Sequence, residues 1–433
     1  MSLRQHGDHR RRSRHRDASQ DAAGLELSVV IPCLNEAATI GRCVSSARDA
    51  MALYNISGEV VVSDNGSTDG SVYLATAAGA RVVHCPTRGY GAALQWGFRH
   101  ARGRCVLMGD GDQSYDFSLL PLFVQRMREG APFVIGSRLK GRIEPGAMPF
   151  LHRYLGTPVL TWILNRLFGT SITDCNCGMR CIDKRTFLSL GVVSSGMEFA
   201  SEMVVKAAVQ GVPITETPID FYKDGRSRRP HLRPLPDGWR HLRLLLSHAP
   251  DHTMTLPGIC MLLLGFPLVL AQLTGPITLG HAHLDIHYMI LGVTLALMGT
   301  SATTMGLAVG ATMPRGKVRQ LAVLARARSW FSFDKAASLA AAAFAIGVLS
   351  DAFVLGYWLY HDRGELTLWF TRLTLFGLVM MSIGVQVGMS ALLLGTTTSA
   401  QAAPEIGRMA AERRSLAHGR RATLREQSTH VLN

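Results

Sequence analysis

Cysteine is scarce in the 433-residue sequence, with eight cysteines scattered along it. This distribution excludes a disulfide framework, and we expect the thiols to be reduced. Three of the cysteines, Cys175, Cys177 and Cys181, form the pattern C-x-C-x3-C. The pattern lacks the C-x2-C pair of common structural zinc sites and has no histidine-rich partner nearby, so it does not favour zinc.

We expect that the N-terminal segment is not a secretory signal. Six arginines lie at positions 4, 10, 11, 12, 14 and 16, but no apolar segment with a cleavage site follows them. We expect residues 1–24 to form a disordered basic tail, which either is simply solvated or contacts anionic lipid headgroups.

Acidic residues are fewer than basic ones, 31 against 45, which gives a formal net charge of +14. Such a charge is compatible with a nucleic-acid-binding protein, but long apolar segments follow residue 251. We therefore expect the basic charge to meet an anionic membrane surface, and we expect no nucleic acid partner.

Short apolar runs rich in β-branched residues alternate with amphipathic helical stretches in the first half of the chain. The runs are residues 28–31, 60–63, 81–84, 105–109 and 133–136, and residues 214–218 are predicted to form an edge strand. This alternation predicts an α/β fold with a mostly parallel sheet over residues 25–235. Such sheets bind ligands in the loops after the strands, and polar residues follow the strands here at positions 32–36, 64–69, 88–91 and 110–112.

Four apolar segments follow, at about residues 253–273, 288–312, 336–360 and 366–394. Each is long enough to span a membrane, so we predict a four-helix transmembrane domain over residues 251–396. The connection 274–287 contains no Lys or Arg, whereas residues 314–335 contain six. The positive-inside rule then places the second connection, the α/β domain and both ends of the chain, including a basic tail over residues 397–433, on the cytoplasmic side.

Two further features of the sequence leave alternatives open. Asp351 and Arg372 fall within predicted spans, and they either pair with each other or extend toward the membrane surface. Residues 236–250 are predicted to form an interfacial amphipathic helix. A second amphipathic helix begins at Thr157, and its Trp162 fits either the membrane interface or an ordinary core.

The sequence Asp110-Gly111-Asp112 directly follows the predicted buried strand at residues 105–109. Two carboxylates one residue apart at a strand end can bind a hard divalent cation, Mg²⁺ or Mn²⁺, which in turn binds diphosphate oxygens. Pairs of this kind also occur in many ordinary turns, so the spacing alone does not identify the site.

Four motifs occur in order, each at a predicted strand end or helix start. They are SVVIPCLNE at residues 28–36, SDNGSTDG at 63–70, GYGAA at 89–93 and MGDGD at 108–112. Together they resemble family 2 glycosyltransferases of the GT-A fold, and more closely the dolichol-phosphate mannose and glucose synthases. The resemblance covers roughly residues 27–230.

The resemblance implies a nucleotide-sugar site. Its expected residues are Pro32, Asn35, Glu36, Asp64, Gly89, Asp110, Gly111, Asp112 and Arg226. Asp64 matches the acidic residue that reads the nucleotide base, although a carboxylate there also suits an ordinary turn. The expected metal ligands are Asp110, Asp112 and Gln113, but relatives carry the glutamine one position later, where this chain has Ser114.

The resemblance also implies a site for the acceptor phosphate. Its expected residues are Ser137, Arg138, Arg153 and Thr157. Arginine binds phosphate through two parallel hydrogen bonds and stays charged, so Arg138 and Arg153, with Asp112, are the expected catalytic residues. Each arginine also suits an ordinary ion pair. Residues 173–180 match a mainly structural motif, and the basic loop within residues 223–236 matches a loop near the diphosphate.

These implications combine into one function, the inverting transfer of a hexose, mannose or glucose, from a GDP- or UDP-sugar to polyprenyl phosphate. A polyprenyl phosphate is already an anionic nucleophile at neutral pH and needs no general base. The alternatives are transfer to a lipid hydroxyl with Glu198 or Glu202 as base, transfer to a polysaccharide, and synthesis coupled to lipid-sugar translocation. The Q-x-x-R-W motif of processive polysaccharide synthases is absent from the sequence.

Richness in arginine and alanine hints at a bacterial source. On that basis we expect an integral protein of the inner membrane that uses undecaprenyl phosphate. The oligomeric state is open, with a homo-oligomer among the options.

Overall fold

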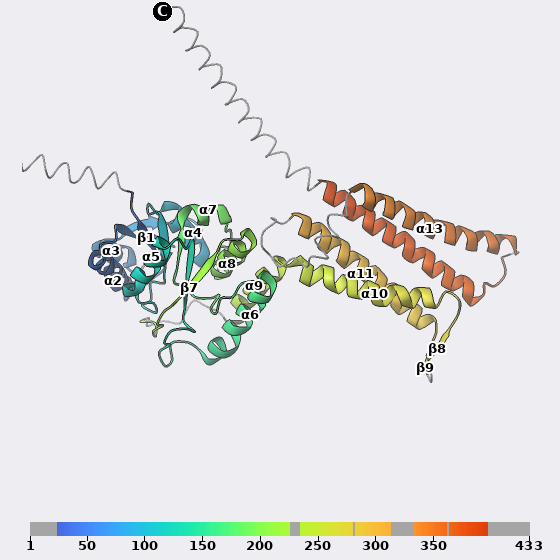
Figure 1. Ribbon diagram of the computed structural model, residues 1–433, viewed down its shortest axis with the longest axis horizontal. Coiled ribbons are helices and arrows are strands. Elements are labelled where there is room, and N and C mark those ends of the chain that lie inside the picture. Colours follow the sequence, from blue (N-terminus) through green and yellow to red (C-terminus); the bar gives the residue numbers. More distant parts are fainter. Residues whose placement is uncertain (1–23, 226–233, 280–281, 313–332, 362, 397–433) are drawn as a thin grey trace, which may run out of the picture. The chain divides into compact units, whose positions relative to one another are not determined.

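The computed structural model describes residues 24–225, 234–279, 282–312, 333–361 and 363–396 (Figure 1). The chain divides into two compact units, and among the described residues the first ends at His248 and the second starts at Ala249. The two predicted tails and most of the connection 314–335, on which the predicted orientation depends, lie outside the described residues.

The first unit is built on a seven-stranded sheet with the order β3-β2-β1-β4-β6-β5-β7. The strands are β1 (Leu27–Cys33), β2 (Gly58–Asp64), β3 (Arg81–His84), β4 (Cys105–Met108), β5 (Phe133–Ser137), β6 (Arg180–Asp183) and β7 (Ile214–Pro218). All neighbouring pairs are parallel except those of β6, which runs antiparallel to β4 and β5. The predicted mostly parallel sheet of a GT-A domain is therefore confirmed, with β6 as a strand that the sequence pattern did not predict.

Helices cover both faces of this sheet. They are α2 (Ile40–Leu53), α3 (Ser71–Ala77), α4 (Tyr90–His100), α5 (Leu120–Arg128), α6 (Thr157–Phe168), α7 (Lys184–Leu190), α8 (Phe199–Gln210) and α9 (Pro234–Ser247), with short turns η1 (Phe117–Leu119) and η2 (His152–Gly156). The chain crosses the sheet from β1 to β3 and then returns to β4, so right-handed crossovers place α2 and α3 on one face and α4 on the other. Helix α2 packs against α5, and α4 packs against α8.

The strand order reverses at β1, which lies between β2 and β4. The loops after β1, β2, β3 and β4 consequently meet at one edge of the sheet, and such a reversal is where open α/β sheets bind ligands. The polar motifs of the sequence all lie in these loops.

Among its described residues, the second unit holds four helices that are long and apolar enough to cross a membrane, Asp251–Ala271, Ile286–Ala311, Phe333–Tyr360 and Leu368–Thr396. They include η3 (Asp251–Thr255), α10 (Leu256–Ala271), α11 (Ile286–Thr312) and α13 (Phe333–Tyr360). The strands β8 (Ile277–Leu279) and β9 (Ala282–Leu284) form a hairpin between α10 and α11. Helices α10 and α11 approach closely through glycines. A Cβ atom on Gly265 would lie 2.6 Å from the carbonyl oxygen of Gly292, as is common for membrane helix pairs.

The alternative that Asp351 and Arg372 pair with each other is wrong. A guanidinium nitrogen of Arg372 lies 2.6 Å from a carboxylate oxygen of Asp285, just before α11. Asp351 instead lies against Gly377, where an added Cβ would be 2.2 Å from its Oδ1. Gly377 is five residues beyond Arg372, or about 7.5 Å along a helix, so the two charged groups lie at different levels.

Candidate active site

The loops after β1 and β2 are joined by hydrogen bonds. The Oδ1 atom of Asn35 accepts the N–H of Thr68 at 2.7 Å, and the N–H of Asn35 donates to the Ser67 hydroxyl at 2.9 Å. Asn35 has a φ of 58°, a left-handed conformation that asparagine tolerates better than most residues. The N–H of Glu36 donates to the Ser71 hydroxyl at 2.7 Å. These contacts fix the first two predicted donor-binding loops as one rigid surface.

Asp64 is the last residue of β2, and its carboxylate is buried. It accepts the N–H of Ser67 at 3.0 Å and that of Gly66 at 3.2 Å, and it lies 3.2 Å from a ring nitrogen of His84. Burial would raise the pKa of Asp64, but the hydrogen bonds from Ser67, His84 and Gly66 together outweigh it, so the pKa is lowered. Asp64 is thus an anion that shapes its own turn, and its contact with the nucleotide base stays a prediction.

Asn65 and Gly89 join this turn to the start of α4. The side chain of Asn65 donates to the carbonyl of Thr87 at 2.7 Å and accepts the N–H of Gly89 at 2.8 Å. Gly89 has a φ of 136°, and an added Cβ would lie 2.3 Å from the carbonyl oxygen of Ser195. Only glycine fits there. Sequence reasoning missed Asn65, whose role depends on this packing.

Asp110 and Asp112 follow β4 at the same edge. The Oδ1 atom of Asp110 accepts the hydroxyl of Tyr90 at 2.8 Å, and Oδ1 of the buried Asp112 accepts the N–H of Ser114 at 3.0 Å. The carbonyl of Gly111, between the aspartates, accepts the Thr39 hydroxyl at 2.7 Å. Both carboxylates are therefore oriented by neighbouring donors, as residues that bind a small cation need to be.

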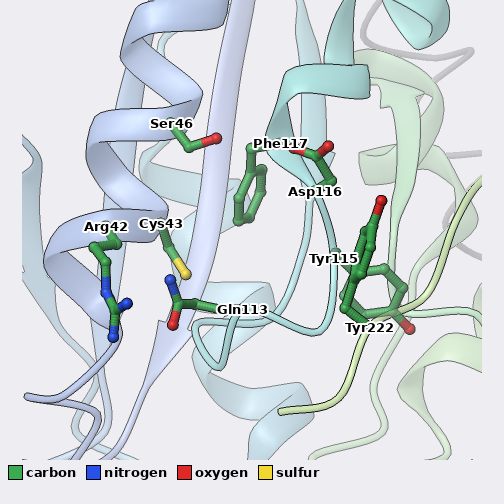
Figure 2. Close-up of a pocket in the computed structure, with 8 residues that line it drawn as sticks. All are labelled: Arg42, Cys43, Ser46, Gln113, Tyr115, Asp116, Phe117 and Tyr222. Carbon is green, nitrogen blue, oxygen red and sulfur yellow. The ribbon is translucent and has the colours of Figure 1, made fainter. Parts of the chain in front are cut away.

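Gln113, the third predicted metal ligand, directly follows Asp112. Its backbone has a φ of 65°. Its side chain lines a pocket of roughly 200 Å³ with Arg42 and Cys43 of α2, as Figure 2 shows. The further lining residues are Ser46, Tyr115, Asp116, Phe117 and Tyr222. The role of Gln113 as a third metal ligand stays a prediction.

The remaining donors at this edge fit a loosely held hard cation. Among the described residues, no group of three or more His, Cys, Asp or Glu side chains converges as a metal site. Two neighbouring carboxylates nevertheless suit Mg²⁺ or Mn²⁺, because Mg²⁺ is usually held by one or two carboxylates while water and substrate phosphates complete its shell.

The stem of the basic loop pairs with the aspartate loop. The N–H of Tyr222 donates to the carbonyl of Ser114 at 3.0 Å, and the N–H of Gly225 donates to that of Asp112 at 2.9 Å. The chain thus enters the basic loop directly beside Asp112. Arg226 and Arg228, predicted to lie near the diphosphate, fall outside the described residues.

Arg138 is buried in an ion pair. Its Nε and Nη2 atoms donate to the two carboxylate oxygens of Asp174 at 2.7 and 2.9 Å, and its guanidinium lies over the ring of Phe221. Burial opposes both charges, but their mutual attraction outweighs it, so the pKa of Asp174 is lowered and that of Arg138 is raised. The adjacent Ser137 hydroxyl is 2.6 Å from that of Thr173. This geometry gives Arg138 a structural role as the partner of a buried carboxylate. Its contact with the acceptor phosphate stays a prediction.

Arg153 has different surroundings. It lies in η2, next to the buried Thr157 that begins α6, and its guanidinium is 5.3 Å from the ring centre of Tyr154. It forms no ion pair with any residue that the structure describes. The residues around it include exposed apolar side chains, namely Phe150, Leu151, Tyr154, Leu155, Val159 and Trp162.

Two tryptophans extend this exposed apolar character. Trp162 on α6 is 66% exposed, so the alternative that it belongs to an ordinary core is wrong. The same helix buries Leu164 and Phe168 on its other face. Trp239 on α9 is 61% exposed, and α6 and α9 pack against each other.

Comparisons with known proteins agree with these observations. Residues 28–190 match the model of glycosyl transferase family 2, and residues 314–398 match the glycosyltransferase family 2 C-terminal transmembrane region. The low-salt glycan biosynthesis hexosyltransferase Agl6 of Haloferax volcanii is 38% identical over 281 residues, which cover 65% of this chain and 67% of that protein. The dolichyl-phosphate hexose transferase of the same organism is 29% identical over 196 residues, 45% of this chain and 82% of that protein.

Among solved structures, the chain is similar to glucosyl-3-phosphoglycerate synthase from Mycobacterium tuberculosis in complex with Mn²⁺, UDP and glucosyl-3-phosphoglycerate. The sequence identity is 21%, the TM-score is 0.42, and the match covers 53% of this chain and 82% of that one. The two family matches and the identity with the Haloferax hexosyltransferase carry the assignment. The chain belongs to glycosyltransferase family 2 and is an integral membrane glycosyltransferase.

Proposed function

We propose that the protein transfers a hexose from a GDP- or UDP-sugar to the phosphate of a polyprenyl phosphate at the cytoplasmic face of a membrane. The observation that carries this proposal is Arg153, an arginine without an ion-pair partner among the described residues, set among exposed apolar side chains. A polyprenyl phosphate has an anionic head on an apolar chain, so it complements this surface. The similarity to the dolichyl-phosphate hexose transferase of Haloferax volcanii supports the same acceptor class.

The donor would bind at the sheet edge. Pro32, Asn35, Glu36, Asp64 and Gly89 would surround the nucleoside, and Arg226 would approach the diphosphate from the basic loop. Asp110 and Asp112 would hold Mg²⁺ or Mn²⁺, which when bound supplies positive charge that stabilises the leaving diphosphate. The stem of the basic loop, paired with the carbonyls of Asp112 and Ser114, supports this arrangement.

The chemistry requires positioning more than proton transfer. The second pKa of a phosphate monoester is about 6, so the acceptor is largely a dianion at neutral pH. One of its oxygens attacks the anomeric carbon, the bond from that carbon to the diphosphate oxygen breaks, and the nucleoside diphosphate leaves with the electron pair. A single displacement of this kind inverts the anomeric configuration. Arg153 would orient the nucleophile, and Ser137, Arg138 and Thr157 would form the rest of the acceptor-phosphate site.

The exposed tryptophans suggest how the lipid arrives. Trp162 and Trp239 would insert at the membrane interface, where tryptophan is enriched, and would bring η2 to the depth of the lipid phosphates. In this arrangement the four apolar helices anchor the domain, in the inner membrane if the source is bacterial.

Transfer to a lipid hydroxyl is the second candidate. This reaction needs a general base, and Glu198 could supply one. One carboxylate oxygen of Glu198 is buried and has no hydrogen-bond partner among the described residues. Glu202 is less suitable, since its carboxylate accepts the N–H groups of Val193 and Ser194 and pairs with Lys206.

The two acceptor classes can be compared directly with the purified full-length protein. We expect a labelled product from polyprenyl phosphate and none from the matching polyprenol, and we expect Glu198→Gln to retain activity. Transfer to polyprenol that disappears in Glu198→Gln would refute the phosphate proposal and support the hydroxyl acceptor.

A further inference from the structure

Tyr90 connects two loops of the active site that are distant in sequence. It is the first residue of α4, directly after the loop that follows β3. Its hydroxyl donates to Oδ1 of Asp110, in the loop after β4, at 2.8 Å. The proposed donor site uses a glycine of the motif GYGAA, but nothing in the proposed reaction uses the tyrosine between the two glycines. A hydroxyl bonded to one oxygen of a carboxylate fixes the rotation of that carboxylate.

The backbone on both sides of Tyr90 is held tightly. A Cβ atom on Gly91 would lie 2.4 Å from the carbonyl oxygen of Ser194, a contact as close as that of Gly89 with Ser195. The N–H of Ala92 donates to the Ser195 carbonyl at 3.1 Å. The tyrosine ring therefore enters the site from a fixed base, and its hydroxyl has little freedom to leave Asp110.

A buried arginine, Arg180, belongs to the electrostatic surroundings of Tyr90. Arg180 is completely buried, and within the described part of the chain it donates only to backbone carbonyls, those of Cys175, Cys177 and Ala200. It forms no ion pair with a carboxylate among the described residues. Arg180 and Asp110 both act electrostatically on the Tyr90 hydroxyl. The hydroxyl is thus oriented toward the carboxylate, because pointing its proton toward Arg180 would bring like charges together.

We infer that Tyr90 is a positioning residue whose hydroxyl holds the Asp110 carboxylate in the orientation that the divalent cation requires. The inference rests on the proposed binding of Mg²⁺ or Mn²⁺ by Asp110 and Asp112. A group that hydrogen-bonds a metal ligand typically changes metal affinity by about 10- to 100-fold when it is removed. Loss of this one hydroxyl should accordingly weaken cation binding while leaving the reacting groups in place.

The test is a Mn²⁺ titration of the full-length protein, followed by the electron paramagnetic resonance signal of the free ion, with UDP or GDP present. We expect Tyr90→Phe to raise the dissociation constant of Mn²⁺ about tenfold. The matched control is Tyr73→Phe on α3, whose side chain is 75% exposed, and it should bind Mn²⁺ like the unmodified protein. The melting temperatures of both variants check that the fold is intact.

The outcomes separate this inference from the proposed function. If the unmodified protein binds Mn²⁺, Asp112→Ala does not, and Tyr90→Phe binds as tightly as the unmodified protein, the positioning role is refuted alone. If the unmodified protein binds no Mn²⁺, the proposed metal dependence fails and the inference fails with it. In transfer assays, a positioning role predicts a higher Mn²⁺ requirement for Tyr90→Phe with kcat nearly restored at saturating Mn²⁺.

Discussion

Arg138 and Arg153 match the same predicted site, yet their surroundings predict opposite effects of mutation. Arg138→Met would leave the fully buried Asp174 without its partner, so we expect the free energy of unfolding to fall by about 3–5 kcal/mol. Denaturant unfolding of the purified variant measures this change. An Arg138→Met variant as stable as the unmodified protein would contradict the structural role of this ion pair.

Arg153→Gln is the matched surface change. Because Arg153 forms no ion pair among the described residues, we expect the free energy of unfolding to change by less than about 0.5 kcal/mol. Loss of a charge-assisted hydrogen bond to phosphate costs about 1.5–3 kcal/mol, so KM for polyprenyl phosphate should rise about tenfold or more. An unchanged KM would remove Arg153 from the acceptor site.

Two of the three aspartates that follow β4, Asp112 and Asp116, allow a similar comparison. Asp112→Asn keeps the shape of the side chain but removes its charge, and we expect kcat/KM to fall by about 100-fold or more. Asp116 caps η1 by accepting the N–H of Ser118 at 2.8 Å, and asparagine caps about as well, so Asp116→Asn should leave transfer unchanged. Equal losses in both variants would indicate a disturbed loop instead of a lost ligand.

At this scale the sequence predicts which residues gather at the edge but not what each one contacts. Asp110 and Asp112 were predictable because they directly follow a buried apolar run. The bond from Tyr90 to Asp110 spans 20 residues and depends on a turn that only glycine can form, which no local pattern encodes. The position of Gln113 depends in the same way on its left-handed backbone conformation.

We expect the packing of α9 against α8 to lose stability at low pH. The Ser201 hydroxyl on α8 lies 2.7 Å from a ring nitrogen of His241 on α9, and both side chains are buried. Burial lowers the pKa of His241 below its usual 6.5, with Arg180 adding to this and Glu198 and Asp237 opposing it. Between the lowered pKa and 6.5 the unfolded chain binds more protons than the folded one, so stability falls as pH falls below 6.5.

We therefore expect the thermal midpoint of the protein to drop as the pH is lowered from 8 to 5. The fall should be smaller in His241→Gln, whose side chain is neutral throughout this range. Midpoints followed by tryptophan fluorescence give the comparison. If the two proteins lose stability equally, protonation of His241 does not loosen α9.

Elements were predictable where their periodicity was strong. The five strands of the first half and the edge strand β7 follow from runs of β-branched residues. Strand β6 was missed because its four residues lie among cysteines and a buried arginine, and its antiparallel direction is set by tertiary contacts with β4 and β5.

For the whole molecule, the four spans were predictable from length and apolarity alone, whereas the pairing of Arg372 with Asp285 required the packed helices. The orientation in the membrane, a homo-oligomer and a role of the spans in translocation stay predictions.

The interfacial role of the exposed tryptophans is testable now. With the spans intact, Trp162→Ser and Trp239→Ser should each raise KM for polyprenyl phosphate in liposomes, while an exposed aromatic on the far helix α3, changed by Tyr73→Ser, should not.

The most direct measurement is transfer of radiolabelled sugar from a panel of GDP- and UDP-sugars into organic-extractable lipid. It uses purified protein, polyprenyl phosphate and Mg²⁺ or Mn²⁺, with Asp112→Ala alongside. We expect one donor to give a labelled lipid that mild acid cleaves and that Asp112→Ala does not form. Metal-dependent nucleotide binding without lipid product from any donor would contradict polyprenyl phosphate as the acceptor.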